Sequence, residues 1–348
     1  MPVHPYRGLP ADQFWSTGVA PVAAGDLDPV RQAKFTFSPG DAVAAAGSCF
    51  AQHIAAFLRQ SGYNYMQTEA PLTQDEPDFS ARFGNIYTVR QLHQLMLGAY
   101  GLHRPATRAW RRADGRFIDP LRPQLFPAGF ASADDVAQAR TTHLAAVRRV
   151  FQDCRVFVFT LGLTEAWLAP DGTALPVPPG VLGADSEAVF HNFTAAEMRQ
   201  DMDAFLADLA AVNPAVRVVL TVSPVPLVAT YEPRNVLVSN TYSKAALRVV
   251  AGEAAAGHAQ VDYFPSYEII TAPQVGGRYF EADLRSVSAA GVAHVMRVFA
   301  AHMMRAEAEA AQDEAAPASV VVSDEARARY AALADVLCDE ALLEPGEG

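Results

Sequence analysis

The hydrophobic pattern of the chain alternates between short apolar runs and longer segments with apolar residues at helical spacing. The clearest runs cover residues 43–46, 155–161, 217–222 and 260–264, and a shorter run covers residues 63–67. Nearly continuous runs of this kind are typical of strands that a parallel sheet buries on both faces. Because the five runs alternate with helical segments, the sequence predicts a three-layer α/β fold with a doubly wound, five-stranded parallel sheet.

The helical segments have recognisable ends. Thr194 and Glu197 have the spacing of a capping box, in which each side chain bonds the backbone N–H of the other residue. Gly62 occupies a position that favours the end of a helix. The spacing of apolar residues predicts helices over residues 50–61, 89–99, 132–151, 195–212, 242–255, 289–311 and 325–343.

Three regions of the chain differ in composition. Residues 1–40 are rich in Pro, Gly and Asp without a sustained period, which predicts an extended N-terminal arm. Residues 41–311 carry the α/β pattern, with an irregular insertion at residues 101–129 that could form a wall of a substrate site. Residues 312–348 combine a linker with a last helix, which we expect to pack on the domain or on a second copy of the chain.

The charge and composition argue against several classes of partner. The formal net charge is −11, from 27 basic and 38 acidic residues, and no basic run is long enough to follow a nucleic-acid backbone. No segment resembles a membrane span or a signal peptide, so we expect a cytoplasmic protein. Cys49, Cys154 and Cys338 fit reduced thiols and lack metal-ligand spacing, so we expect no metal and no cofactor.

The chemistry-bearing residues begin at the junction of the first predicted strand and helix. Ser48 and Cys49 follow Gly47 there, and a group at the start of a helix lies near backbone N–H groups that have no partner within the helix. An oxyanion that forms beside Ser48 would be stabilised by these groups. Two other interpretations exist: Ser48 could simply cap the helix, or the Cys49 thiol could be the nucleophile.

The five residues Gly47, Ser48, Cys49, Phe50 and Ala51 resemble the motif for which the GSCFA family is named. That family looks like a branch of the SGNH, or GDSL-type, hydrolases, whose fold is a flavodoxin-like α/β domain. The resemblance implies that Ser48 is the nucleophile, with its own N–H as one oxyanion donor, and that Cys49 is a packed neighbour.

Further SGNH motifs match the chain more loosely. The resemblance implies that Gly84, with Asn85 beside it, supplies a second oxyanion donor, although a Gly-Asn pair is also an ordinary turn. Gly162 matches the glycine of a third motif, whose asparagine and aspartate positions are occupied by Thr164 and Glu165. Glu165 could orient a histidine or bind a substrate hydroxyl, or it could be an ordinary loop carboxylate.

The last SGNH motif, Asp-x-x-His, supplies the base of the family. Asp283 stands at the aspartate position, whereas Ser286 stands at the position of the histidine. A serine hydroxyl cannot act as a base near neutral pH, so the chain is an inactivated variant, engineered or natural, or it takes its base from another histidine. His191, which lies just before a predicted helix, is the leading alternative, and the others are His4, His53 and His294.

The resemblance implies an esterase or acyltransferase that acts on acyl esters, typically O-acetyl esters of glycans. Trp110 and Trp167 could stack on a sugar, or both could be packed in the interior. A second hypothesis is a carbohydrate- or acyl-ligand-binding protein on the same fold, without catalysis. A third is a structural subunit that assembles through the C-terminal helix.

Overall fold

The computed structural model describes residues 4–71, 79–180 and 187–305. The strands are β1 (Val43–Gly47), β2 (Trp110–Arg111), β3 (Phe117–Ile118), β4 (Val156–Leu161), β5 (Glu165–Leu168), β6 (Ala174–Leu175), β7 (Val189–Asn192), β8 (Arg217–Val222) and β9 (Val261–Tyr263). The α-helices are α1 (Trp15–Gly18), α2 (Ala51–Gln60), α3 (Val89–Ala99), α4 (Ala133–Asp153), α5 (Ala195–Val212), α6 (Val236–Gly257), α7 (Ser266–Thr271) and α8 (Ala289–Met303). Short 3₁₀ helices cover Ala11–Gln13, Ala24–Asp26 and Pro273–Val275.

The central sheet has four parallel strands in the order β1-β4-β8-β9. The prediction of a parallel α/β sheet is therefore confirmed, but the prediction of five strands is wrong. The run at residues 63–67 forms only an isolated parallel bridge between Tyr65 and Val43. It bonds β1 through the N–H of Met66 and the carbonyl of Asn64, and no regular strand develops from this short contact.

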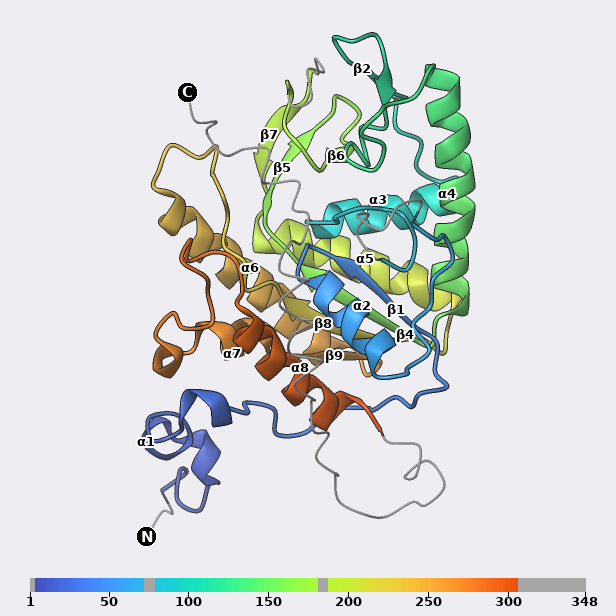
Figure 1. Ribbon diagram of the computed structural model, residues 1–348. Helices are drawn as coiled ribbons and strands as arrows, with labels where there is room; N and C mark the ends of the chain where they lie inside the picture. The colour runs from blue at the N-terminus through green and yellow to red at the C-terminus, as the bar shows by residue number, and fades with distance from the viewer. Residues whose placement is uncertain (1–3, 72–78, 181–186, 306–348) are drawn as a thin grey trace.

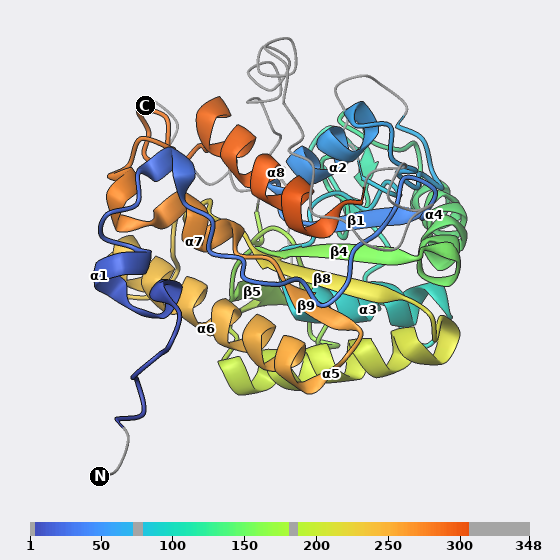
Figure 2. The same ribbon diagram turned by 90° about the horizontal axis from the view of Figure 1, so that it is seen from below.

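Helices cover the sheet on both faces, which gives three layers (Figures 1 and 2). One face packs against α2, α7 and α8, with Ile54, Ile269 and Phe299 in the interior. The other face packs against α3, α4, α5 and α6, with Leu92 and Phe205 among the buried residues. Strands β4 and β8 are almost wholly buried, as their continuous apolar sequences predict.

Side-chain caps fix the starts of several helices. The predicted capping box of Thr194 and Glu197 is present at α5, and Ser132 and Asp135 form another at α4. Helix α6 begins earlier than the predicted range of 242–255, because the side chain of Asn235 accepts a hydrogen bond from the backbone N–H of Leu237.

Two small sheets lie outside the main sheet, in segments for which the sequence pattern predicted no strands. Strands β2 and β3 form a hairpin within the insertion at residues 101–129. Strands β6, β5 and β7 form an antiparallel sheet. Since β5 follows β4 after three residues, this sheet stands beyond the carboxyl edge of the main sheet, at the top of Figure 1.

The N-terminal arm lies against α8, and it contains short helical turns where the composition predicted an extended segment. The carbonyl of Gly25 accepts a hydrogen bond from Arg297, and Asp28 pairs with His302. The predicted helix over residues 325–343 and the end of the predicted helix over 289–311 lie outside the described residues.

Candidate active site

The chain turns sharply between β1 and α2, and Ser48 lies at this turn. Gly47 has a φ of 140°, which a residue with a side chain rarely adopts. A Cβ atom at residue 47 would also lie 2.4 Å from the backbone carbonyl oxygen of Thr160 on β4. The turn therefore requires glycine for both its dihedral angle and the close approach of β1 to β4.

The Ser48 hydroxyl is buried and has no hydrogen-bond partner among the described residues. The residue is only 3% exposed. Helix α2 begins at Ala51 and Phe50 occupies its N-cap position, without a side-chain cap. The interpretation of Ser48 as an ordinary helix cap is therefore wrong, since its Oγ atom accepts none of the helix N–H groups.

The backbone amide of Ser48 has a structural partner. Its N–H donates to the carbonyl oxygen of Thr160 at 3.1 Å. The expectation that the Ser48 N–H serves as an oxyanion donor is therefore contradicted, because the bond that joins the turn to β4 already uses it. Cys49 is buried as a free thiol, which agrees with a packed neighbour.

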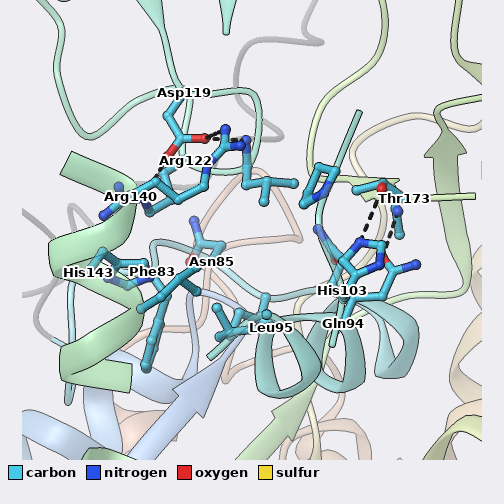
Figure 3. A pocket seen from close by; sticks show the side chains of 17 residues that line it. Phe83, Asn85, Gln94, Leu95, His103, Asp119, Arg122, Arg140, His143 and Thr173 are labelled. Atoms are coloured by element: carbon cyan, nitrogen blue, oxygen red, sulfur yellow. Dashed lines mark hydrogen bonds and ion pairs between the residues drawn. The ribbon is translucent and has the colours of Figure 1, made fainter. Parts of the chain in front are cut away.

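Gly84 and Asn85 lie beside the same turn, because the N–H of Ile86 donates to the carbonyl oxygen of Gly47 at 2.8 Å. Gly84 has a φ of 68°, and a Cβ atom there would meet nothing within 4 Å. Among the described residues we find no acceptor for the Gly84 N–H. The buried side chain of Asn85 lines a separate cavity between α3 and α4 (Figure 3).

Gly162 packs directly against Ser48. A Cβ atom at residue 162 would lie 3.2 Å from the Ser48 Cβ atom and 3.1 Å from the Tyr87 ring. Its N–H donates to the Tyr87 carbonyl oxygen at 3.0 Å, and its carbonyl accepts from the buried Lys244 ammonium at 2.7 Å. Gly162 therefore makes room for Ser48, while its backbone groups hold the surrounding loops.

Thr164 is fully buried and its polar groups are bonded within the protein. Its N–H donates to the hydroxyl of Ser243 at 3.1 Å, and its Oγ1 donates to the amide oxygen of Asn192 at 2.7 Å. The amide nitrogen of Asn192 in turn donates to Glu232 at 2.9 Å. Thr164, which the resemblance placed at the asparagine position of the third motif, therefore ties the start of β5 to α6 and β7.

Glu165 fixes the loop that follows β8. Its carboxylate accepts a hydrogen bond from the Thr230 hydroxyl at 2.6 Å and another from the Tyr231 N–H at 3.1 Å. Burial raises the pKa of Glu165 above its ordinary value, although both hydrogen bonds act in the opposite direction. In the described part of the chain the carboxylate contacts no histidine. Its observed role is to hold the loop after β8 through Thr230 and Tyr231.

A cleft of about 460 Å³ lies between the small sheet of β5, β6 and β7 and the loop after β8. Glu165 lines it, and so do three aromatic side chains, Trp167, Phe190 and Tyr231, whose ring centroids lie 4.9–5.8 Å apart. Tyr231 is 68% exposed, whereas Trp110 is buried and packed. The pattern of the sequence did not single out Tyr231 or Phe190.

The cleft reaches the neighbourhood of Ser48. Tyr87 and Leu163 line it, and both N–H groups of the pair Gly162 and Leu163 donate to the Tyr87 carbonyl oxygen. The Tyr87 ring and the Ser48 Cβ atom lie 3.1 Å and 3.2 Å from a Cβ position at residue 162, so Tyr87 connects the cleft with the surroundings of Ser48, which does not itself line the cleft.

Asp283 and Ser286 form a closed turn before α8. The Asp283 carboxylate accepts hydrogen bonds from the N–H groups of Arg285 and Ser286, both at 2.9 Å, and from the Ser286 hydroxyl at 2.6 Å. Although partial burial raises the pKa of Asp283, these bonds outweigh it and lower the pKa overall. Arg285 ties the turn to the loop after β8 through the carbonyl of Pro226.

The turn of Asp283 thus lies near the carboxyl edge of the sheet, but no hydrogen bond in the described part of the chain joins it to Ser48. The Ser286 hydroxyl is bonded to Oδ2 of the Asp283 carboxylate.

Two of the histidines that could replace the missing base are bonded elsewhere. His191, on β7, shares a hydrogen bond of 2.9 Å with Glu197. The sequence favours a surface position for His294 on the predicted helix over residues 289–311, but the residue is buried, and its ring nitrogens contact the Tyr279 hydroxyl and the Leu27 carbonyl at 2.7 Å. The surface prediction is therefore wrong, because the N-terminal arm covers this side of α8.

His53 and His4 also lack the features of a base for Ser48. His53 is buried on α2 beside Phe50, and burial lowers its pKa to about 4. His4 lies on the exposed N-terminal arm, where its Nδ1 accepts the N–H of Tyr6. Within the described ranges, no histidine donates to or accepts from the Ser48 hydroxyl.

Neither a metal site nor a membrane span is found in the described part of the chain. No three His, Cys, Asp or Glu side chains there are grouped closely enough to hold a metal ion. None of the helices there has the length and hydrophobicity needed to cross a membrane.

Comparison with family profiles gives a match over most of the chain. The profile of the GSCFA family matches residues 42–299, which is most of the chain and includes Ser48 and Asp283. No curated protein and no solved structure shows significant similarity.

Proposed function

The chain belongs to the GSCFA family, and from this premise we propose that it is an SGNH-type serine esterase or acyltransferase site that has lost its base. Its substrates would be acyl esters, of which O-acetyl esters of glycans are typical for SGNH relatives. The observation that carries the proposal is the buried Ser48 hydroxyl, which has no partner among the described residues.

An unbonded buried hydroxyl costs about 1–3 kcal/mol, so its retention on a turn that requires Gly47 calls for a functional reason. In the proposed reaction, Ser48 Oγ attacks the ester carbonyl carbon, the acyl C–O bond breaks, and the leaving alcohol takes a proton. Water or a second alcohol then removes the acyl group from Ser48. The N–H of Gly84, which has no acceptor among the residues that the structure describes, would bind the oxyanion.

The missing step is the removal of the Ser48 proton. Asp283 is ionised near neutral pH, because its pKa is lowered, but it bonds the Ser286 hydroxyl rather than an imidazole. A hydroxyl cannot accept the proton, so water must take it, and acylation is expected to be slow.

The proposal can be tested by incubating the chain with an activated acetyl ester and locating any acetyl group by peptide mass spectrometry. We expect slow, stoichiometric acetylation of Ser48 that is absent in Ser48→Ala. A Cys49→Ala variant serves as the matched control, because it removes the neighbouring nucleophile. Acetylation of Cys49 alone, or only of Lys34, the exposed one of the two lysines, would contradict the assignment of Ser48.

A second function, ligand binding without catalysis, is favoured by the aromatic side chains of the cleft. Trp167 and Tyr231 offer ring faces of the kind on which sugars stack, and the cleft of about 460 Å³ is large enough for a small glycan. Titration with acetylated oligosaccharides, beside a Trp167→Ala variant, tests this function. Tight binding without acetylation of Ser48 would favour the binding protein over the enzyme.

A further inference from the structure

A second cavity, of about 60 Å³, lies between α3, α4, the insertion around residues 119–122 and the loop at Thr173 (Figure 3). It is a different pocket from the cleft near Ser48, and Gln91 lines both. Most of its wall is apolar, and its polar groups are gathered at two ends. One end has His103 bonded to Thr173 at 3.1 Å, and the other end has Asp119, Arg122 and Arg140.

Asp119 holds the two arginines in place. Its carboxylate accepts from Arg122 Nε at 3.1 Å and from Arg140 Nη2 at 2.5 Å. Asp119 and Arg122 are buried, with side chains 1% and 3% exposed, and Arg140 is 12% exposed. Burial alone would raise the pKa of Asp119, but the two guanidinium groups lower it, so the carboxylate is charged.

Each arginine keeps one buried nitrogen without a partner among the described residues. These atoms are Nη2 of Arg122 and Nε of Arg140. A guanidinium N–H that is removed from water without an acceptor costs more than a neutral donor in the same position. Two such groups at one end of one cavity therefore indicate a site for an acceptor that the chain itself does not provide.

His143, on α4, completes this end of the cavity. Its Nδ1 bonds Glu69 Oε2 at 2.6 Å, and its buried Nε2 has no partner among the described residues. Burial, and secondly Arg122, lower the pKa of His143 to about 4, so the imidazole is neutral. Since the Glu69 carboxylate can only accept, the proton lies on Nδ1, and Nε2 presents a lone pair.

We propose that this cavity binds a small carboxylic acid. The oxygens of its carboxyl group accept hydrogen bonds from Arg122 Nη2 and Arg140 Nε, and its acidic proton is shared with His143 Nε2. Its short apolar chain lies against Leu95 and Leu144.

The charges of the site agree with this ligand. The carboxylates of Asp119 and Glu69 balance the guanidinium groups of Arg122 and Arg140, and His143 is neutral. A carboxylate that enters together with one proton leaves the balance unchanged, whereas a phosphate dianion would leave buried negative charge uncompensated. His103, at the other end, is bonded to Thr173.

The volume limits the size of the ligand. About 15 Å³ accommodates one water-sized group, so about 60 Å³ holds roughly four such groups. Acetate and propionate, with four and five non-hydrogen atoms, are of this size. The proposal is independent of the proposed reaction at Ser48, because the two sites are different pockets.

Ligand-observed NMR titration with ¹³C-labelled acetate and propionate tests the proposal on the full chain. We expect a Kd of about 1 mM or tighter, since very small ligands bind with high efficiency per atom. We also expect the affinity for the carboxylate to rise by up to about tenfold per pH unit as the pH falls from 8 to 6, because one proton is taken up. Propionamide and inorganic phosphate should bind at least about tenfold more weakly.

Two variants and their controls locate the site. Arg140→Lys keeps the positive charge beside Asp119 but removes Nε, and it should weaken binding by about tenfold or more. Arg149→Lys, on the same helix and exposed, should leave binding unchanged. Gly98→Leu fills the apolar part of the cavity without changing a charged group, and it should abolish binding, with folding checked by thermal unfolding.

Three outcomes would overturn the proposal. The first is no binding of acetate or propionate at 50 mM, since the expected Kd is ~1 mM. The second is phosphate binding as tight as acetate binding, and the third is unchanged binding in both Arg140→Lys and Gly98→Leu. Ser48→Ala should bind the acids like the unmodified chain. Loss of binding in Ser48→Ala would place the ligand at the Ser48 cleft and would also overturn it.

Discussion

Replacing Ser286 with histidine tests whether the site lacks only its base. In the chain as it stands, the Ser286 hydroxyl donates to Asp283 Oδ2 at 2.6 Å, while two backbone N–H groups hold Oδ1. An imidazole at residue 286 would replace that hydroxyl, and its Nδ1–H would bond the same oxygen. The other nitrogen would then be an acceptor for the Ser48 proton.

The expected gain follows from the base alone. Loss of the base from a serine-hydrolase triad lowers turnover by roughly 10⁶-fold, which sets the upper bound for the gain. The Ser48 N–H is bonded to Thr160 in the chain and in the variant alike, so a missing oxyanion donor, which costs about 10²–10³-fold, lowers both rates and cancels in their ratio. We therefore expect Ser286→His to raise ester hydrolysis by at least about 10³-fold, which corresponds to about 4 kcal/mol of transition-state stabilisation.

The assay is hydrolysis of 4-nitrophenyl acetate by Ser286→His, compared with Ser286→Asn, whose side chain can bond Asp283 but cannot act as a base. The rate should rise with pH through the pKa of the new imidazole, at or above about 6.5, because only the neutral ring accepts a proton and Asp283 favours the charged ring. The same gain in a Ser48→Ala, Ser286→His double variant would refute the reasoning, since the imidazole would then act without Ser48.

Three further predictions concern stability and can be checked by urea unfolding. Gly47→Ala should lower the free energy of unfolding by about 3 kcal/mol, because the φ of residue 47 is unfavourable for alanine and the new Cβ atom would clash with Thr160. An unchanged free energy of unfolding would show that β1 and β4 separate easily. His53 has a pKa of about 4 when folded, below that of unfolded histidine, so protonation favours the unfolded chain as the pH falls. The free energy of unfolding should therefore drop by about 2 kcal/mol between pH 7 and pH 5, and His53→Leu should reduce this pH dependence. Gly98→Ala should stabilise the chain by about 0.5–1 kcal/mol, because the residue is helical and the new methyl group meets Leu144 at an ordinary contact distance of 3.5 Å. A destabilised variant would contradict the inference that a methyl group fits beside residue 98.

The sequence was sufficient to place Ser48 at the carboxyl edge of a parallel sheet, because the strand, the glycine and the helix are adjacent in the chain. It did not show that the run at residues 63–67 forms only one bridge, since that depends on how far the segment stays beside β1. It also missed β5 and β7, which are short and lie among prolines and glycines. Their pairing with each other, rather than their own composition, makes them strands.

Contacts between distant segments account for most of what could not be predicted at the sites. Glu69 and His143 are 74 positions apart, and only the packing of α4 brings them together. The Ser48 amide could not be assigned to Thr160 from sequence, because that bond depends on the register of β1 with β4. Both Glu165 and Thr164 proved to be bonded within the protein, which no local spacing indicates.

The turn around Ser48 is held almost entirely by main-chain bonds, from Ser48 to Thr160, from Ile86 to Gly47 and from Gly162 to Tyr87. Bonds of this kind do not depend on which side chains surround them. A change at position 286 therefore leaves the position of the Ser48 hydroxyl intact. Under the function proposed above, a lineage could exchange the residue at position 286 without displacing Ser48, and the geometry of the turn would persist whether or not the site catalyses.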